Sequence, residues 1–518
     1  MSAGTGGEPG LNPARGRGIQ TRMKKLVPFS KRLVPGLWGL GLSVAFGLGA
    51  APLKPSTPNI VIILADDLGY GSLSCYGADT NLVRTPHCDR LAREGIRFTD
   101  AYAPASICTP TRYALLTGRY CWRTSLQFGV LSYDAPLLVE TNRLTVASLL
   151  KKRGYRTAAI GKWHLGYGPP PAADYTGPLR PGPLQLGFDY HFAVPCNHGD
   201  VTGVYVENEG VYGLRSRQLK PFGASAYGGK PFLGLDAPQR TNETVMATLT
   251  DRAVAWIEEQ KPGRPFFLYF APVAVHEPVT PSAQTAGTSR AGPYGDWIHE
   301  LDLSVGRVLE ALDKKGVAAE TLVIFTSDNG GENKLRGAAT QLQAQNAGLK
   351  INGPFRAGKH SIFEGGLREP FLVRWPGRAP AGAVSHEMIS LVDLLATFAA
   401  IVGEPLPPPT VAAEDSVNVL PAILGERTTR PLRADLIGHS ADGVFAIREG
   451  PWKFIEGVPA RKGPGGGIAD KSAENKRQLY NLAEDPGEQR DLSAQHPEIV
   501  QRLAQRLEQQ RKAGHSRN

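Results

Sequence analysis

Residues 59–67 read NIVIILADD, a continuous apolar run that ends in two aspartates. A short run of this kind, rich in Val and Ile, is typical of a strand that is buried on both faces of a parallel sheet. The segment therefore predicts a central strand with Asp66 and Asp67 at its carboxyl end.

Three further apolar runs are also followed by polar residues. Arg156–Ile160 leads to Lys162 and His164, Phe266–Ala271 leads to His276, and Leu322–Ser327 leads to Asp328 and Asn329. Helical patterns alternate with these runs, which predicts an α/β sheet with helices on both faces. Because the carboxyl ends of the strands in such a sheet gather along one edge, we expect the four polar groups to converge there.

The aspartates and the asparagine in these groups are candidate metal ligands. Asp66, Asp67, Asp328 and Asn329 offer only oxygen atoms, which suits a hard cation such as Ca²⁺ or Mg²⁺ better than zinc. Each pair alone is also typical of a helix cap or a turn. Their placement after strong strand patterns favours a shared metal site.

The run CTPTRYALLTGR, residues 108–119, predicts a helix that begins with Thr109 as N-cap and Pro110 as the first helical residue. Cys108 would then lie at the mouth of the helix, where unpaired N–H groups create positive potential. Arg112 follows about one turn later and can reach the same face. This arrangement suits an anion, although a cysteine before a helix can also be a buried structural residue.

The same run resembles the sulfatase signature, C-x-P-x-R followed by L-x-x-G-R, in Cys108, Pro110, Arg112, Leu116, Gly118 and Arg119. Three other strings resemble sulfatase blocks: GKWHLG, the H-x-P segment at His276, and the segment around Lys359. Lys162, His164, His276 and Lys359 would each be ordinary polar residues without that context. Residue 360 is His where the family very often has glycine, and Glu364, Gly365, Gly366 and Arg368 are expected to shape the fold rather than react.

The resemblance implies a catalytic site in which Cys108 is oxidised by a maturation enzyme to formylglycine. One Ca²⁺ is then held by Asp66, Asp67, Asp328 and Asn329 together with residue 108, and Arg112, Lys162 and Lys359 neutralise the sulfate. Asp328 is implied as the base for the attacking hydrate, His276 with Lys359 as the acid for the departing alcohol, and His164 as the base that lets sulfate leave. His276 and Asn197, in VPCNHG, are implied substrate contacts, with His198 a further candidate.

These features predict a hydrolase of sulfate monoesters, either aryl or carbohydrate sulfates. A phosphonate or phosphodiester hydrolase of the same superfamily is the alternative, because such enzymes share the motif. A sulfoglycan-binding relative without activity is a second alternative, but it would not need Cys108 together with both histidines.

The resemblance also implies an alkaline-phosphatase-like fold with a large, mainly parallel mixed sheet. A Pro-rich stretch, 404–409, precedes the tail, and we expect a catalytic domain over 52–425 and a smaller α+β domain with an antiparallel sheet over 426–518. GVFAIREGPWKFIEG predicts a hairpin there, and 496–512 a terminal amphipathic helix. Residues 168–235 are rich in Gly, Pro and Tyr and predict long surface loops, and 333–358 reads as an insertion.

The first 51 residues predict an exported protein. A basic stretch from Met23 to Arg32 precedes an apolar region that ends in Ala50 and Ala51, as in a signal peptide over about 23–51. We therefore expect a periplasmic or secreted enzyme, with membrane attachment only if the leader is not cleaved. The leader also carries much of the net charge of +10, and no basic cluster with interleaved aromatic residues indicates nucleic acid binding. The five cysteines, Cys75, Cys88, Cys108, Cys121 and Cys196, suggest no dense disulfide framework.

Overall fold

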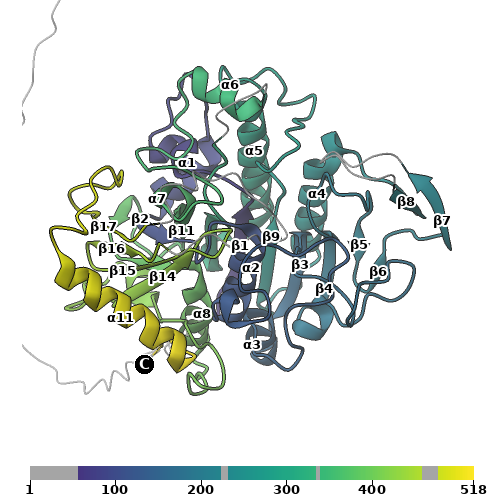
Figure 1. The fold of residues 1–518 in the computed structure, drawn as a ribbon. Helices are drawn as coiled ribbons and strands as arrows, with labels where there is room; N and C mark the ends of the chain where they lie inside the picture. The colour runs from purple at the N-terminus through teal and green to yellow at the C-terminus, as the bar shows by residue number, and fades with distance from the viewer. Residues whose placement is uncertain (1–56, 223–231, 334–338, 458–475, 518) are drawn as a thin grey trace, which may run out of the picture. The chain divides into compact units, whose positions relative to one another are not determined.

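A large mixed sheet forms the centre of the molecule (Figure 1). A computed structural model describes residues 57–222, 232–333, 339–457 and 476–517. The strand order is β12-β2-β11-β10-β1-β9-β3-β4-β5-β6, with β13 beside β2. The leader over 1–51, with its signal peptide, lies outside the described residues.

Strand β1 covers Asn59–Ala65, as the apolar run predicts, and lies between β10 and β9, both parallel to it. The bounds of the other strands of this sheet are β2 Ile96–Tyr102, β3 Arg156–Lys162, β4 Tyr190–Val194, β5 Val206–Glu207, β6 Gly210–Val211, β9 Phe266–Ala271, β10 Thr321–Ser327, β11 Arg368–Arg374, β12 Ala383–Ser385 and β13 Ile389–Ser390. The pairs β3–β9 and β3–β4 are also parallel, whereas β11 runs antiparallel to both β10 and β2. The predicted large, mainly parallel mixed sheet is confirmed.

Helices pack on both faces of the sheet, because successive residues of a central strand point to opposite sides. Ile60, Ile62 and Leu64 of β1 belong to one buried cluster, and Val61 and Ile63 to another. Helices α2 (Cys108–Thr117), α3 (Val146–Lys152) and α8 (Leu394–Val402) contribute to the first cluster, whereas α1 (Pro86–Glu94), α4 (Val245–Glu258) and α5 (Pro293–Lys314) contribute to the second. The central strands are therefore buried on both faces, and their polar carboxyl ends have only one edge at which to gather.

A separate four-stranded antiparallel sheet follows near the C-terminus, in the order β14-β15-β16-β17. Its strands are Asp435–His439, Phe445–Glu449, Trp452–Ile455 and Gln478–Asn481, and α11 (Pro497–Ala513) packs on it through Leu503 and Leu507. The predicted hairpin, antiparallel sheet and terminal helix are confirmed. The boundary at residue 425 stays a prediction.

Two expectations about the variable regions need correction. Residues 168–235 were expected to be surface loops, but they contain β4, β5 and β6 of the main sheet and most of a separate hairpin of β7 (Ser216–Phe222) and β8 (Phe232–Asp236). The short buried strands are hidden in sequence because Gly and Pro dominate the connections between them. The 333–358 insertion contains a short helix, α6 (Thr340–Asn346), whose polar sequence gives little helical pattern.

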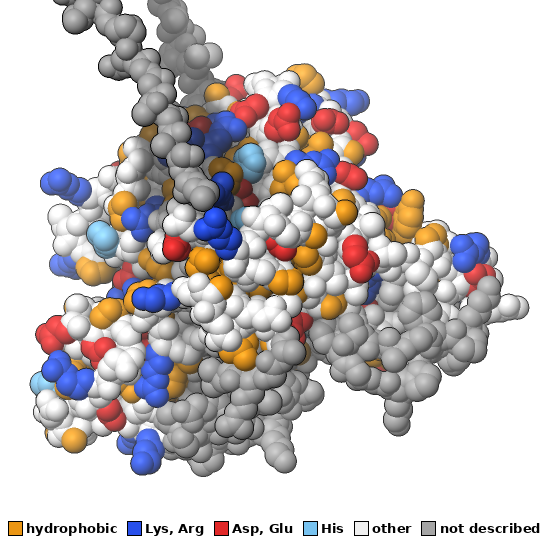
Figure 2. Space-filling model, turned by 90° about the horizontal axis from the view of Figure 1, so that it is seen from above, with side chains coloured by type: hydrophobic (Ala, Val, Ile, Leu, Met, Phe, Trp, Pro, Cys, Tyr) orange, Lys and Arg blue, Asp and Glu red, His pale blue; other side chains and the backbone are white. Residues whose placement is uncertain are grey.

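Charges of both signs alternate on the described part of the face shown in Figure 2. Within the described residues, no helix is long and apolar enough to span a membrane.

Candidate active site

Two neighbouring strands place the candidate metal ligands. Ala65 of β1 is in register with Ser327 of β10, so Asp66 and Asp328 continue side by side beyond the sheet. The Asp67 N–H donates to Asp328 Oδ1 at 3.1 Å. Asp66 also exchanges two backbone hydrogen bonds with the segment before His276, of 3.0 Å to Ala274 and 2.6 Å from Val275. The predicted convergence of the strand ends is therefore observed for these groups.

Helix α2 carries Cys108 and Arg112 into the same place. The helix begins at Cys108 with Ile107 as N-cap, two residues earlier than the predicted start at Pro110 with Thr109 as N-cap, because the extended backbone already ends at Ile107. Thr109 is not a cap: its Oγ1 donates to the His164 carbonyl at 3.1 Å. Cys108 is 2 % exposed, with Sγ 3.8 Å from Asp66 Oδ1 and 3.4 Å from Lys162 Nζ.

Two buried cations bind the carboxylates of Asp66 and Asp328. Arg112 donates to Asp328 Oδ2 through Nη2 at 2.6 Å and lies 3.3 Å from Asp66 Oδ1. Lys162 Nζ lies 2.7 and 2.8 Å from the two Asp66 oxygens. All four side chains are 0 % exposed. Lys162 reaches this position as the last residue of β3.

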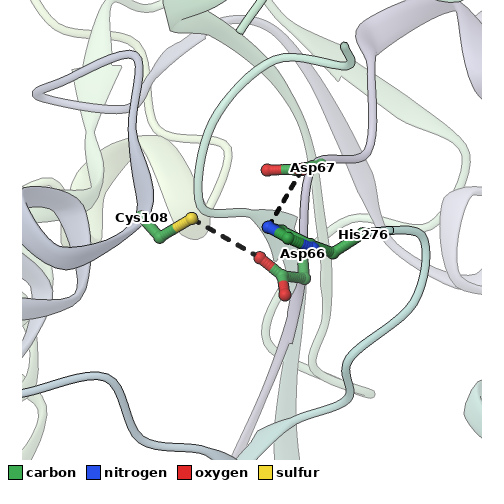
Figure 3. Close-up of side chains that lie close together, drawn as sticks. All are labelled: Asp66, Asp67, Cys108 and His276. Carbon is green, nitrogen blue, oxygen red and sulfur yellow. Dashed lines mark hydrogen bonds and ion pairs between the residues drawn. The ribbon is translucent and has the colours of Figure 1, made fainter. Parts of the chain in front are cut away.

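A second group surrounds Asp67. Lys359 Nζ lies 2.6 Å and His276 Nε2 lies 3.7 Å from Asp67 Oδ2. Figure 3 shows His276 and Asp67 on one side of the site, with Cys108 and Asp66 directed toward each other. Burial raises the pKa of Asp67, but the attraction of Lys359 and Lys162 outweighs it and holds this pKa below its ordinary value. Asp67 is therefore ionised.

The oxygen atoms of this site fit a hard cation. One carboxylate oxygen each of Asp66 and Asp67 lies within 4.8 Å of the other, in a group that also includes the Cys108 sulfur and a His276 ring nitrogen. Asn329 Nδ2 donates to Asp67 Oδ1 at 2.8 Å, and Asn329 Oδ1 is buried with no hydrogen-bond partner among the described residues. A buried amide oxygen without a donor is costly unless it binds an ion or water. The chemistry of these donors therefore suits the oxygen-coordinated cation predicted from sequence.

The formal charges of the site balance. The carboxylates of Asp66, Asp67 and Asp328 face the cations of Arg112, Lys162 and Lys359, three of each sign. Burial raises the pKa of Asp328 to about 6 despite the attraction of Arg112. A bound divalent cation would make the site net positive, which favours an anionic substrate.

The two catalytic histidine candidates are neutral. Burial, with the nearby charge of Lys162, lowers the pKa of His164 well below its ordinary value, and burial with Lys359 does the same for His276. His164 Nε2 lies 3.0 Å from the Leu131 carbonyl, and His276 Nδ1 lies 2.6 Å from the Glu277 carbonyl. Since a carbonyl oxygen only accepts, these ring nitrogens carry the protons. The other nitrogen of each ring is therefore a proton acceptor.

The cysteine is a poor nucleophile as it stands. Burial raises the pKa of Cys108 above its ordinary value, against the attraction of Lys162. The reactive form of cysteine is the thiolate, and a buried thiol with a raised pKa is inert.

The loop that carries Lys359 is held by a buried network. Lys453 of β16 lies 2.9 Å from Glu364 and 2.8 Å from Glu488, and Arg368 lies 2.7 Å from Glu364. This confirms the structural part expected for Glu364 and Arg368. His360 has φ of +76°, a conformation that glycine adopts without strain, which explains why glycine is common at this position in the family.

Asn197 is connected to the site through its neighbour in the chain, His198. The His198 ring is 6.4 Å from the His276 ring, measured between centroids. Sequence reasoning missed two residues: Arg240, whose side chain is 1 % exposed and binds the loop of Asn197, and Glu369, which is fully buried. Burial raises the pKa of Glu369 well above its ordinary value, so this carboxyl is neutral. The feature of the sequence that could have pointed to Glu369 is its position next to Arg368 in a strand that is buried.

Comparison with known proteins agrees with this geometry. The sulfatase family model matches residues 58–404. The chain is 36 % identical over 482 residues to N-acetylgalactosamine-6-O-sulfatase of Bacteroides thetaiotaomicron, covering 87 % of this chain and 92 % of that protein. It is 37 % identical over 492 residues to human arylsulfatase A, covering 90 % and 89 %. A solved structure from work on glycosaminoglycan metabolism by Bacteroides thetaiotaomicron has a TM-score of 0.79 and 34 % identity, covering 88 % of this chain and 99 % of that one. The chain belongs to the sulfatase family and is a sulfatase enzyme.

Proposed function

We propose that this sulfatase hydrolyses the sulfate ester of a sulfated carbohydrate. The observation that carries the proposal is the convergence of three buried or nearly buried cations, Arg112, Lys162 and Lys359, beside Cys108. A sulfate monoester needs its negative charge neutralised where the sulfur is attacked. The relative named as an N-acetylgalactosamine-6-O-sulfatase favours a sulfated amino sugar over an aryl sulfate as the natural substrate.

One Ca²⁺ per chain is proposed at the carboxylate cluster. Asp66, Asp67, Asp328 and Asn329 would hold it, with residue 108 as a further contact. The ion would supply positive charge to the sulfate oxygens. The unpaired Asn329 Oδ1 and the all-oxygen set of side chains support this choice.

Conversion of Cys108 to formylglycine is proposed as the activating step, carried out by a maturation enzyme. The modified residue would supply a hydrated aldehyde as the nucleophile. The buried thiol with its raised pKa supports the proposal, because unmodified cysteine has little thiolate at this position.

The chain's own residues have distinct proposed parts in the reaction. Asp328 accepts a proton, which its pKa of about 6 permits near neutral pH. Lys359 Nζ and His276 Nε2 lie at the same Asp67 oxygen; the Lys359 ammonium is the source of the proton, and His276 takes it up at Nε2 and passes it to the departing alcohol. His164 Nδ1 has no hydrogen-bond partner within the described ranges and accepts the proton that accompanies sulfate release.

Export to the periplasm or the exterior is also proposed, on the basic and apolar leader. A sulfated glycan or smaller sulfated sugar would meet the enzyme there.

Two measurements on one preparation test the function. Mass spectrometry of the peptide with Cys108 should show loss of the thiol sulfur and gain of an aldehyde, and specific activity should follow the converted fraction. The converted protein should cleave N-acetylgalactosamine 6-sulfate faster than phosphate or phosphonate esters with the same alcohol. Faster phosphonate or phosphodiester cleavage would favour the alternative hydrolase, and binding without turnover would favour a binding protein. Full activity with unmodified Cys108 would contradict the proposed nucleophile.

A further inference from the structure

A single buried arginine, Arg240, fixes the conformation of the loop formed by residues 197–204. Its Nε donates to the His198 carbonyl at 3.0 Å, and its two Nη atoms donate to the carbonyls of Asn197 at 3.2 Å and Val204 at 2.5 Å. The same side chain lies 2.8 Å from Asp200 Oδ1 and is 1 % exposed. All these bonds end on one loop, so removal of this guanidinium would release several carbonyl groups at once.

The loop adjoins the catalytic residues through His198. His198 Nε2 lies 2.8 Å from the Pro278 carbonyl, and the His198 ring centroid is 6.0 Å from that of Trp297 as well as 6.4 Å from that of His276. Trp297 in turn donates its indole N–H to the His276 carbonyl at 3.2 Å. The position of the loop is therefore coupled to the segment that carries His276.

Two polar atoms of the loop have no hydrogen-bond partner in the part of the chain that the structure describes. They are Asn197 Oδ1 and His198 Nδ1. Because Nε2 of His198 faces a carbonyl oxygen, it carries the proton, and Nδ1 is an acceptor. Burial lowers the pKa of His198 to about 3, which keeps the ring neutral. Two acceptors without donors, on a loop whose His198 ring lies 6.4 Å from the His276 ring between centroids, match the hydroxyl groups of a sugar, which are donors.

We propose that Arg240 is a positioning residue that presets the 197–204 loop, so that Asn197 and His198 accept hydrogen bonds from hydroxyl groups of the sulfated sugar. The inference rests on the proposed function, because it assigns the recognition of the alcohol part of that substrate. A loop that is ordered before binding avoids the loss of conformational entropy that substrate binding would otherwise cause by ordering its backbone. The planar guanidinium with its five donors suits a ring of carbonyls, whereas the three donors of a lysine ammonium cannot reach all of them.

The test uses Arg240→Met and Arg240→Lys in the converted, calcium-loaded full chain. KM for N-acetylgalactosamine 6-sulfate should rise about ten-fold or more in Arg240→Met, the equivalent of one hydrogen-bonded contact. The rise should be several-fold smaller for 4-nitrophenyl sulfate, which has no sugar hydroxyls, and Arg240→Lys should fall between wild type and Arg240→Met. Hydrogen exchange should become faster in peptides from 197–204.

Arg433→Lys provides a matched control. Arg433 is also buried, at 2 % exposed, and binds Asp393 at 2.8 Å and the Asp435 carbonyl at 3.0 Å, and its hydrogen-bond partners within the described residues lie outside the 197–204 loop. This control should lose stability without changing the ratio of the two KM values. Equal losses on both substrates in Arg240→Lys, or the same ratio change in Arg433→Lys, would overturn the inference. Wild-type protein that is converted and yet cleaves neither sulfate would overturn the proposed function as well, so the two failures are distinguishable.

Discussion

Asp66→Asn tests the proposed metal site by a measurement that does not depend on turnover. Asp66 is 0 % exposed, and its oxygens lie 2.7 and 2.8 Å from Lys162 and 3.3 Å from Arg112. Loss of its charge leaves a buried ammonium without its carboxylate, and breaking a buried ion pair in this way costs about 3–5 kcal/mol. We expect the free energy of unfolding without metal to fall by that amount.

The stabilisation by calcium should distinguish loss of the metal site from a general loss of stability. A ligand at 100 times its dissociation constant stabilises the native state by about 2.7 kcal/mol. Wild type should show a stabilisation of this order when Ca²⁺ replaces chelator in urea unfolding, and Asp66→Asn should show much less. Asp393→Asn is the control, because Asp393 is equally buried, pairs with Arg433 at 2.8 Å and is not a proposed metal ligand. It should lose a similar free energy and keep the full effect of calcium.

The reasoning would be refuted if Asp66→Asn kept the full calcium effect. It would also be refuted if Asp393→Asn lost the calcium effect to the same degree, because the loss of stabilisation by Ca²⁺ would then follow from any destabilisation of the protein and not from loss of a metal ligand.

Three further predictions concern the histidines, the buried network and the metal. His276→Ala should slow the cleavage of sugar sulfates far more than that of activated aryl sulfates, because a stable phenolate hardly needs a proton. His164→Ala should slow both classes alike and let the sulfated enzyme accumulate. Kinetics with both substrates and the intact mass of the enzyme test this, and the opposite pattern would exchange the two roles. Burial raises the pKa of Glu488 to about 7 against the attraction of Lys453, so the folded protein holds a proton at a pH at which the unfolded chain has already released it. The resulting stabilisation is complete below the pKa of Glu488 in the unfolded chain and is lost as the pH rises through 7. Glu488→Gln should therefore reduce the dependence of the free energy of unfolding on pH, measured by urea unfolding between about pH 5 and 8. Exhaustive chelation should abolish turnover and added Ca²⁺ restore it, and full activity in the chelated protein would exclude a catalytic metal.

The positions of the central strands follow from the sequence because each is a local signal. The run NIVIILADD predicts β1 to the residue, since both faces of a central strand are buried and the apolar run has no interruption. The polar residues behind the strands predict one shared edge because parallel strands end together. The site residues could therefore be named before their contacts were known.

Tertiary structure decided which charges pair. Nothing local in the sequence indicates that Arg112 binds Asp328 while Lys162 binds Asp66, because these pairs join segments 216 and 96 residues apart. Burial also sets the protonation of His164, His276 and Cys108, which depends on the packing around each group.

The variable regions show the same division. Strands β5 and β6 are two residues long, and the pairing of β5 with β4 and of β6 with β5 comes from the sheet edge that they extend and not from their own pattern. Arg240 is an ordinary arginine in the sequence, and only the folded loop around it gives its guanidinium a ring of carbonyls. The sequence alone determined the sheet, the motif residues and the family chemistry that they imply, because short-range apolar patterns and motifs encode them. The pairing of the buried charges and the loop held by Arg240 were decided by the tertiary structure, because contacts between distant segments and exclusion of water exist only in the folded chain.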